Sequence, residues 1–392
     1  MMFNLTNEEI KENNAVHTAS EIHQQPAVWK KLVSMFFQQK ESLKGFVESI
    51  YTKHEQVRVI LTGAGTSAFV GDTVAPELNK LNNDHVQFEA IPTTDIVSNP
   101  KEYLFDDIPT IMVSFARSGN SPESLATVAL GQKMIKDFYQ VVITCNKEGQ
   151  LATNIKHDDK SITILMPEKA NDQSLAMTSS FTCMIIAAYE LFTPEVFTGN
   201  GTKQVIANAQ QLVDQVAESV DAILEFDFDR IVYLGSGSLG QLAHEASLKM
   251  LELSAGKVVA LHESSLGFRH GPKSILNEKS AVVIFMSQDP YTRKYDLDIL
   301  RELTAGDSGM KVIALTEKAD EEVEKLADWT IPVNCGEAAL NSDFSLALLY
   351  IIFAQVLAMK KSIQLGITPD NPSPTGAISR VVQGVTIHEY EA

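Results

Sequence analysis

Two short segments in the second half of the chain carry side chains that could move protons. Residues 244–252, HEASLKMLE, place Glu245, Lys249 and Glu252 on one face of a predicted helix, at spacings of four and three. Such a face is commonly a set of solvated ion pairs, but it could also supply a carboxylate base beside a cation. His270 precedes a Gly-Pro pair and is therefore expected on a loop, as an ordinary surface side chain or as an acid–base group.

A turn in the first half of the chain could bind an anion. Residues 63–67, GAGTS, follow an apolar run and precede a helical pattern. The N–H groups and hydroxyls of Gly65, Thr66 and Ser67 could therefore converge on a phosphate, although a tight turn with a Ser/Thr helix cap explains the segment equally well. The third glycine of a dinucleotide-binding turn and the Gly-Lys-Ser/Thr of a P-loop are both missing, so neither NAD nor ATP is expected.

A second loop offers more groups to a phosphate. Residues 114–121, SFARSGNS, stand at the carboxyl end of the next predicted strand, where open parallel sheets bind ligands. Arg117 could supply a guanidinium, and Ser118 and Ser121 could supply hydroxyls. Because Pro122 follows it, Ser121 is also expected to cap a helix, and the two roles are compatible.

The elements that must position these residues follow an alternating pattern. Residues 1 to about 50 show helical periodicity, and after them apolar segments rich in β-branched residues alternate with helical patterns, which is typical of parallel sheets covered on both faces. The expected strands are 57–62, 110–114, 140–144 and 161–165, and then, after a helical stretch at 204–224, 230–234, 257–261, 281–286, 311–316 and 330–333.

The two series of strands are similar to each other. RVILTGAGTSAFVGD at 58–72 resembles RIVYLGSGSLGQLAHE at 230–245, and TIMVSFARSGNSPES has its counterpart in AVVIFMSQDPYTRKY. This repetition predicts a duplicated α/β unit. We expect a helical arm at 1–45, two doubly wound parallel-sheet domains at 46–205 and 206–365, and a tail at 366–392. The tail is rich in Pro, Gly, Ser and Thr and is expected to be extended, either as a surface strap or closing over a site.

The charge and composition of the chain indicate which kinds of partner it is not expected to bind. The formal net charge is −18 and no Lys/Arg cluster exceeds a pair, so nucleic acid is not an expected partner. The N-terminus lacks a signal pattern, and the apolar stretch at 346–357 contains Gln355, so a buried helix and a cytoplasmic protein without membrane contact are expected. Cys145, Cys183 and Cys335 lie far apart and are expected to be reduced core residues, with no metal-ligand spacing.

Together these motifs resemble those of the sugar isomerase (SIS) domain family, whose members bind phosphosugars, over most of the chain. GAGTS and SFARSGNSPES are similar to the family's phosphate-binding loops. HEASLKMLELS followed by FRHGP is similar to the catalytic helix and loop of the isomerase half of glucosamine-6-phosphate synthase. The resemblance implies three catalytic residues. Glu252 would move a proton between C1 and C2, His270 would open the sugar ring, and Lys249, the neighbouring helix lysine, would stabilise negative charge that develops on O1. In the family this histidine can come from the partner subunit, so a homodimer or homotetramer is expected.

The pattern is most similar to the galactosamine-6-phosphate deaminase/isomerase group, once described as tagatose-6-phosphate ketose/aldose isomerases. The segment AMTSSFT at 176–182, the insertion Ala116-Arg117 and the tail motif NPSPTG carry this similarity, which implies that Ser179 contributes to substrate binding. Two positions depart from the synthase pattern. Ala116 replaces a serine, and Gln383 replaces a catalytic lysine, for which Arg380 could substitute in part.

The implied reaction is the deaminating isomerisation of galactosamine 6-phosphate to tagatose 6-phosphate and ammonia, by acid–base chemistry without a metal or cofactor. Two alternatives remain open. One is an aldose/ketose isomerase that acts on phosphorylated hexoses without loss of nitrogen, and the other is a sugar-phosphate-binding regulator without turnover. The sequence does not decide between galacto and gluco substrates, which differ at one hydroxyl.

Overall fold

Contacts within the chain group it into two compact units, each built around one parallel sheet. The computed structural model describes residues 1–81, 85–193, 200–306, 308–336, 338–340, 342–380, 382 and 384–391. The first unit comprises Val28–Asp172, Ser179–Thr198 and Gly376–Ala392, and the second comprises Met1–Ala27, Gln173–Thr178 and Gly199–Thr375. The domain boundaries expected after residues 45, 205 and 365 stay a proposal.

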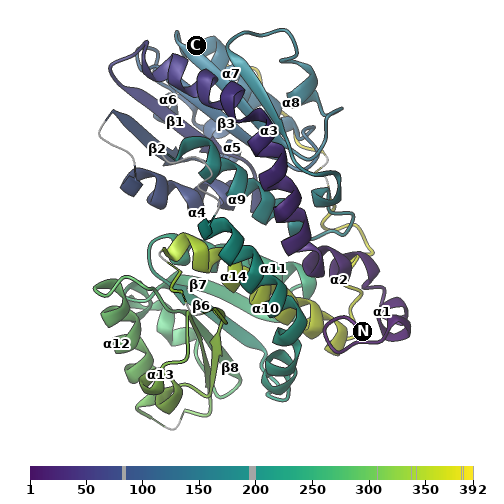
Figure 1. Ribbon diagram of the computed structural model, residues 1–392. Helices are drawn as coiled ribbons and strands as arrows, with labels where there is room; N and C mark the ends of the chain where they lie inside the picture. The colour runs from purple at the N-terminus through teal and green to yellow at the C-terminus, as the bar shows by residue number, and fades with distance from the viewer. Residues whose placement is uncertain are drawn as a thin grey trace. The chain divides into compact units, whose positions relative to one another are not determined.

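Parallel strands alternate with helices in each unit (Figure 1). The elements up to residue 192, leaving out α1 and α2, are α3 (Gln25–Tyr51), β1 (Val57–Thr62), α4 (Thr66–Leu81), β2 (Val86–Ala90), α5 (Thr93–Ser98), α6 (Pro100–Tyr103), β3 (Thr110–Ala116), α7 (Pro122–Met134), β4 (Phe138–Thr144), α8 (Gln150–Thr153), β5 (Ser161–Leu165), η1 (Glu168–Ala170) and α9 (Ser179–Phe192). The second unit contains α1 (Asn7–Glu12), α2 (Val16–His23), α10 (Asn200–Leu224), β6 (Arg230–Gly235), α11 (Ser238–Leu253), β7 (Val259–Ser264), η2 (Gly267–His270), η3 (Pro272–Ile275), β8 (Ser280–Phe285), α12 (Thr292–Thr304), β9 (Lys311–Thr316), α13 (Glu321–Leu326), β10 (Trp329–Pro332) and α14 (Asp343–Gln364).

The two sheets have the same strand order. The first is β2-β1-β3-β4-β5 and the second, read in the corresponding direction, is β7-β6-β8-β9-β10, with all pairs parallel. Arg58 of β1 pairs with Thr110 of β3, and Arg230 of β6 pairs with Ser280 of β8, so the strands correspond residue by residue. The predicted pair of doubly wound α/β units is confirmed. We call the sheet of β1–β5 with its helices the first repeat and that of β6–β10 the second repeat.

The repeated Gly-x-Gly turns have the same geometric cause in both repeats. A Cβ atom on Gly63 would lie 2.5 Å from the carbonyl carbon of Ser67, and one on Gly235 would lie 2.6 Å from that of Leu239. The second glycine of each turn, Gly65 or Gly237, has φ of +56°, a conformation that side chains disfavour. The turn between strand and helix therefore requires glycine at both positions.

All nine expected strands overlap observed ones with shifts of at most two residues at their starts, and the expected strand at 257–261 is β7, which begins at Val259. Strand β2 is absent from the expectation. Its sequence alternates a buried Val86 and Phe88 with the more exposed Gln87 and Glu89, because it lies at the edge of its sheet. A five-residue alternating segment carries a weaker signal than the continuous apolar runs of central strands such as β1.

The expected buried helix around residues 346–357 is α14. In the part of the chain that the structure describes, α14 is the helix long and apolar enough to cross a membrane, and 94% of its apolar window is buried inside the protein. Its Gln355 accepts a hydrogen bond of 2.8 Å from Nε2 of Gln25. The cysteine expectation needs correction, because Cys335 is exposed, whereas Cys183 is buried and Cys145 is partly buried.

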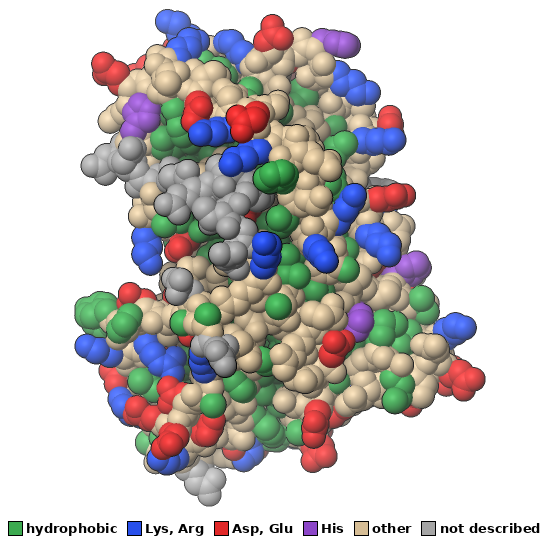
Figure 2. All heavy atoms as spheres, viewed as in Figure 1, with side chains coloured by type: hydrophobic (Ala, Val, Ile, Leu, Met, Phe, Trp, Pro, Cys, Tyr) green, Lys and Arg blue, Asp and Glu red, His purple; other side chains and the backbone are tan. Residues whose placement is uncertain are grey.

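Acidic and basic side chains are intermixed on the face shown in Figure 2. Around α12 and α13 they form ion pairs, in which Arg293 lies 2.5 Å from Asp320 and Arg301 contacts both Asp298 and Glu322. Asp320 also caps α13 by accepting the N–H groups of its first turn. The large negative charge of the chain is therefore partly balanced locally on this surface.

Candidate functional site

The loop that joins β3 to α7 presents a row of backbone donors. Within the described residues, no protein acceptor bonds to the N–H of Ser118, Gly119 or Ser121, and the N–H of Asn120 donates to the Ser118 hydroxyl at 3.3 Å. Gly119 has φ of +69°, so the chain turns sharply here. Successive N–H groups in such a turn, at the start of a helix, form a concave site for an anion.

The other side of this loop is held in place by hydrogen bonds. The Ser118 carbonyl accepts from Nδ2 of Asn146 at 2.9 Å, and the Gly119 carbonyl accepts from the N–H of Leu151 at 3.0 Å. Oδ1 of Asn120 accepts from the N–H of Gln150 at 2.9 Å. The carbonyls of this loop are thus bonded to the segment after β4. The N–H groups of Ser118, Gly119 and Ser121 are the ones that a ligand could accept from.

Ser121 begins α7 as expected, but its hydroxyl does not cap the helix backbone. Ser121 is the N-cap residue by position and Pro122 is the first helical residue. The Ser121 hydroxyl is instead 2.6 Å from the Ser124 hydroxyl. The predicted capping hydrogen bond is therefore wrong, and the two paired hydroxyls stand at the helix start beside the loop donors.

The glycine turn after β1 ends at the same edge of the sheet as this loop, because β1 and β3 are adjacent and parallel. Gly65 is exposed, whereas Thr66 and Ser67 are about 5% exposed and begin α4. Arg117 is also buried, at 7% exposure. The structure thus brings together the predicted phosphate-binding residues of the glycine turn and the serine loop at the carboxyl edge of the first sheet.

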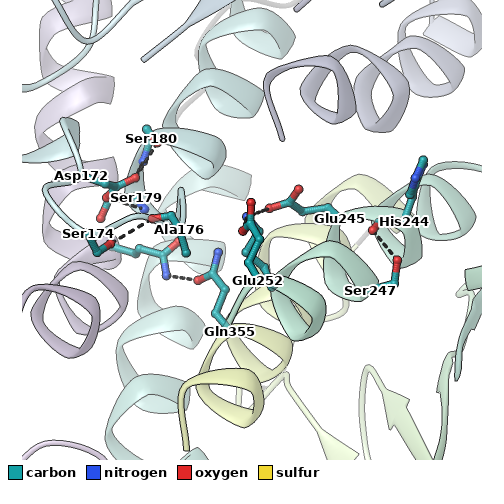
Figure 3. A network of polar contacts seen from close by, with 12 residues as sticks. Asp172, Ser174, Ala176, Ser179, Ser180, His244, Glu245, Ser247, Glu252 and Gln355 are labelled. Carbon is teal, nitrogen blue, oxygen red and sulfur yellow. Dashed lines mark hydrogen bonds and ion pairs between the residues drawn. The ribbon is translucent and has the colours of Figure 1, made fainter. Parts of the chain in front are cut away.

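Asp172 organises the start of α9, where Ser179 lies (Figure 3). The carboxylate of this fully buried residue accepts the N–H of Ser179 at 3.1 Å, the N–H of Ser180 at 2.9 Å and the Ser180 hydroxyl at 2.5 Å. The N–H of Ser179 is therefore committed to Asp172. Sequence reasoning missed Asp172, because a carboxylate seven residues before a helix start falls outside the usual capping spacing.

The C-terminal tail reaches the same part of the first unit. Nη2 of Arg380 donates to Oδ1 of Asn171 at 3.0 Å and also bonds to the Asp172 carbonyl, while Nη2 of Arg117 donates to the Arg380 carbonyl at 2.9 Å. The described residues of the tail contain no helix or strand, and they include turns at 369–370 and 374–375. Gln383 lies outside the described residues.

The acid–base candidates on α11 form a buried cluster. The Lys249 ammonium lies 2.5 Å from Oε2 of Glu252 and 3.4 Å from Oε1 of Glu245. Lys249 and Glu245 have no exposed side-chain surface, whereas the side chain of Glu252 is 21% exposed. The alternative of a solvated set of ion pairs is therefore wrong for Lys249 and Glu245. Both carboxylates extend from the same side of the helix (Figure 3).

Electrostatics keep this lysine charged despite its burial. Burial alone would lower the pKa of Lys249, but the neighbouring Glu245 and Glu252 carboxylates outweigh it and raise the pKa above its ordinary value. A buried ammonium between two carboxylates holds them in fixed positions. Glu252 is the member of the cluster that can reach a ligand, because it alone has exposed surface.

The histidines of the second unit differ in their surroundings. His270 lies in η2 and is exposed, and within the described residues its side chain forms no hydrogen bond or ion pair, so no such contact joins it to Lys249 or Glu252. His244 of α11 stacks on His262 of β7, with ring centroids 3.8 Å apart. Burial and the neighbouring His262 lower the pKa of His244 to about 4. Sequence reasoning did not anticipate this pair.

Comparison with known proteins agrees with the duplicated architecture. The family model described as SIS domain matches residues 53–194 and 226–360. The chain is similar to D-galactosamine-6-phosphate deaminase AgaS of Shewanella sp. strain ANA-3, with 41% identity over 387 residues, covering 98% of this chain and 95% of that protein.

Two solved structures extend this similarity to three dimensions. A chain from Clostridium novyi has a TM-score of 0.94 and 40% identity, with 100% of this chain and 99% of that one covered. The tagatose-6-phosphate ketose/aldose isomerase from Escherichia coli has a TM-score of 0.87 and 37% identity, with 95% and 97% covered. The chain therefore belongs to the SIS domain family and carries two copies of that domain.

Proposed function

We propose that this chain is an amino-sugar-phosphate deaminase/isomerase, which converts galactosamine 6-phosphate to tagatose 6-phosphate and ammonia. The printed name of the relative from Shewanella supports this substrate, and the identity of 41% extends over nearly the whole of both chains. The observation that carries the proposal is the buried cluster of α11. Lys249 and Glu245 have no exposed side-chain surface, and burying ionised side chains costs several kcal/mol per ion even when they are paired, so such a cluster is a candidate for function rather than for stability.

The first repeat is proposed to bind the phosphate. The N–H groups of Ser118, Gly119 and Ser121 and the hydroxyls of Ser118 and Ser121 supply donors that match the oxygens of a phosphate. Gly65, Thr66, Ser67, Arg117 and Ser179 are assigned to substrate binding at the same edge of the sheet. Binding energy from this remote end positions C1 and C2 for reaction.

The second repeat is proposed to supply the acid–base groups. In the open-chain sugar, the C1 aldehyde makes the C2 hydrogen acidic, and the Glu252 carboxylate removes that proton. The electron pair of the C2–H bond forms the C1–C2 double bond of an enolamine, and the proton returns to C1. The C2 imine that results is attacked by water, ammonia leaves, and the ketose phosphate remains.

Lys249 is assigned a positioning role. It has no exposed surface and lies 2.5 Å from Glu252, so it acts on the base rather than on the sugar. Its charge orients the Glu252 carboxylate and favours negative charge developing on the substrate oxygen O1. This revises the expectation that Lys249 is itself a catalytic group.

His270 is proposed to open the sugar ring. Its exposed position in η2 is compatible with a histidine that acts on substrate held by a neighbouring subunit, as the family resemblance implies. A homodimer or homotetramer is therefore part of the proposal. We also propose a cytoplasmic location, where phosphorylated sugars are metabolised.

A second candidate function is aldose/ketose isomerisation without loss of nitrogen, which the printed title of the Escherichia coli structure favours. Ammonia and ketose release should be measured with galactosamine 6-phosphate, glucosamine 6-phosphate and their N-acetyl derivatives, and tagatose 6-phosphate should be tested for conversion to an aldose. Equal amounts of ammonia and ketose support the deaminase. Interconversion of aldose and ketose without ammonia supports the plain isomerase, and binding without any product supports a regulator.

A further inference from the structure

The second repeat contains a counterpart of the phosphate-binding loop. Arg58 pairs with Thr110 and Arg230 pairs with Ser280, so β3 and β8 correspond at a constant offset. Helices α7 and α12 each contain 13 residues and begin at the same offset, at Pro122 and Thr292. The loop at 117–121 therefore corresponds to the loop at 287–291, and Gly119 corresponds to Asp289.

The backbone donors of the second loop are bonded to groups of the chain itself. The N–H of Ser287 donates to Oδ2 of Asp296 at 2.9 Å, and the N–H of Gln288 donates to Oδ1 of Asp343 at 2.8 Å. The N–H of Asp289 donates to the Ser287 hydroxyl at 3.1 Å, and this hydroxyl donates to Asp343 at 2.5 Å.

The start of α12 is satisfied by Asp289. Its Oδ1 accepts the N–H of Tyr291 at 3.0 Å and that of Thr292 at 2.8 Å, and Pro290 between them has no N–H. Every N–H from Ser287 to Thr292 therefore has an internal acceptor, and four of these five N–H groups donate to carboxylate oxygens.

Asp296 extends this arrangement to the neighbouring strands. It is fully buried and also accepts the hydroxyls of Ser265 at 2.5 Å and Ser236 at 3.3 Å. Ser236 lies in the glycine turn after β6, and Ser265 directly follows β7. At the carboxyl edge of the second sheet, both the glycine turn and the loop before α12 thus donate hydrogen bonds to carboxylates of the chain itself. The corresponding turn and loop of the first repeat are the ones proposed to bind phosphate.

We infer that Asp289 excludes phosphate from the second repeat, so that each chain binds one phosphosugar, in the first repeat. The carboxylate accepts the N–H groups at the helix start, which a phosphate would need, and with Asp296 and Asp343 it makes the loop repel a dianion. In the first repeat the corresponding residue is Gly119, which has no side chain to fill the turn. Asp289 at the place of Gly119, supported by Asp296 and Asp343, therefore distinguishes the second repeat from the first for substrate, and this inference rests on the phosphate assignment proposed for the first repeat.

The test is to count bound inorganic phosphate by equilibrium dialysis. The proteins compared are the unmodified chain, a first-loop variant with Ser118→Ala and Ser121→Ala, Asp289→Gly, and the three substitutions combined. Asp289→Asn is the matched control, because its amide oxygen can still accept the N–H groups. We expect one phosphate per chain, weakened at least about tenfold in the first-loop variant. We expect a second, weaker site of about millimolar Kd in Asp289→Gly but not in Asp289→Asn.

Two results would overturn the inference. One is two phosphates per unmodified chain, with one of them unaffected by the first-loop substitutions. The other is no gain of phosphate binding when Asp289→Gly is added to the first-loop variant, in a protein whose circular dichroism shows that it is folded. If Asp289→Gly does not fold, the count for the unmodified chain decides. The gain is measured against the same chain with Asp289 intact, so failure of the proposed phosphate assignment would be seen separately, as unchanged binding in the first-loop variant.

Discussion

The Lys249 ammonium lies 2.5 Å from the Glu252 carboxylate, and Lys249 has no exposed surface while Glu252 keeps about one fifth of its side chain exposed. One partner of this ion pair thus belongs to the protein interior and the other to the surface. Glu245 completes the cluster from within, 3.4 Å from the same ammonium. This arrangement separates a group that holds the base from a base that can meet a substrate.

Removing the lysine charge should destabilise the fold. Lys249→Met leaves Glu245 buried without its cation, and breaking a buried pair in this way costs about 3–5 kcal/mol. The free energy of unfolding, measured by urea denaturation, should fall by that amount. Adding Glu245→Gln should restore much of the loss, because the second substitution removes the uncompensated charge. A Lys249→Met variant as stable as the unmodified chain would contradict the burial of the ion cluster.

Removing the loop hydroxyls should weaken substrate binding. Ser118→Ala with Ser121→Ala removes two donors to the phosphate, and each lost hydrogen bond to a charged group costs about 1.5–3 kcal/mol. KM for the phosphosugar should therefore rise at least about tenfold, with a smaller change in kcat. Gln288→Ala, at the position of the second repeat that corresponds to Ser118, is the matched control and should leave KM unchanged. An unchanged KM in the double variant would locate the phosphate elsewhere.

The placement of the candidate phosphate-binding residues at one edge of the first sheet can be predicted from sequence, because these residues lie in short local segments. Gly65, Ser118 and Ser121 lie in short turns directly after apolar strands, and parallel strands bring such turns to one edge. Asp172 and Arg380 could not be predicted in this way. Arg380 contacts Asp172, which lies 208 residues earlier in the chain, and no spacing rule describes a contact between residues so far apart in sequence.

The second repeat shows a different limit of prediction from sequence. The helical spacing of Glu245, Lys249 and Glu252 is visible in the sequence, but their burial is not, because an exposed ion-paired face has the same spacing. The N–H groups of the second loop donate to Asp296 and Asp343, which lie on two separate helices, α12 and α14, and the sequence does not show that these helices meet the loop. The fold itself was predictable, since the repeated strand, turn and helix pattern requires only local signals.

The stability of the protein should depend on His244 at mildly acidic pH. Its folded-state pKa of about 4 lies below the unfolded value of about 6.5, so its contribution is fully present above pH 6.5 and is lost as the pH falls towards 4. His244→Phe keeps a ring that can stack on His262 but does not titrate. Between pH 7.5 and pH 4.5 the variant should lose about 1–2 kcal/mol less unfolding free energy than the unmodified chain, after allowance for partial exposure.

The exposed His157 provides the control for this prediction. His157→Phe should leave the pH dependence of the unfolding free energy as it is in the unmodified chain. Equal pH dependence in His244→Phe and the unmodified chain would show that the stacked histidine pair does not oppose protonation.

Mixing inactive variants tests whether His270 acts on a neighbouring subunit. His270→Ala and Glu252→Gln should each be inactive alone, the first for lack of ring opening and the second for lack of the base. In a dimer with shared sites, random mixing gives half heterodimers, each with one intact site, so about a quarter of the unmodified activity should return. Ammonia release after co-refolding or co-expression measures this. No recovery in confirmed mixed oligomers would mean that His270 and Glu252 act within one chain or that His270 has another role.

The most direct test of the account is the exchange of the C2 hydrogen in Glu252→Gln. The substitution keeps the shape and the phosphate-binding loop but removes the base, which should lower kcat about 10²- to 10⁴-fold. Ammonia release from galactosamine 6-phosphate and incorporation of deuterium from heavy water should fall together, while substrate binding is retained. Glu218→Gln, an exposed carboxylate on α10, is the control and should behave as the unmodified chain. Near-normal ammonia release and deuterium exchange in Glu252→Gln would contradict the role of Glu252 as the C1–C2 base.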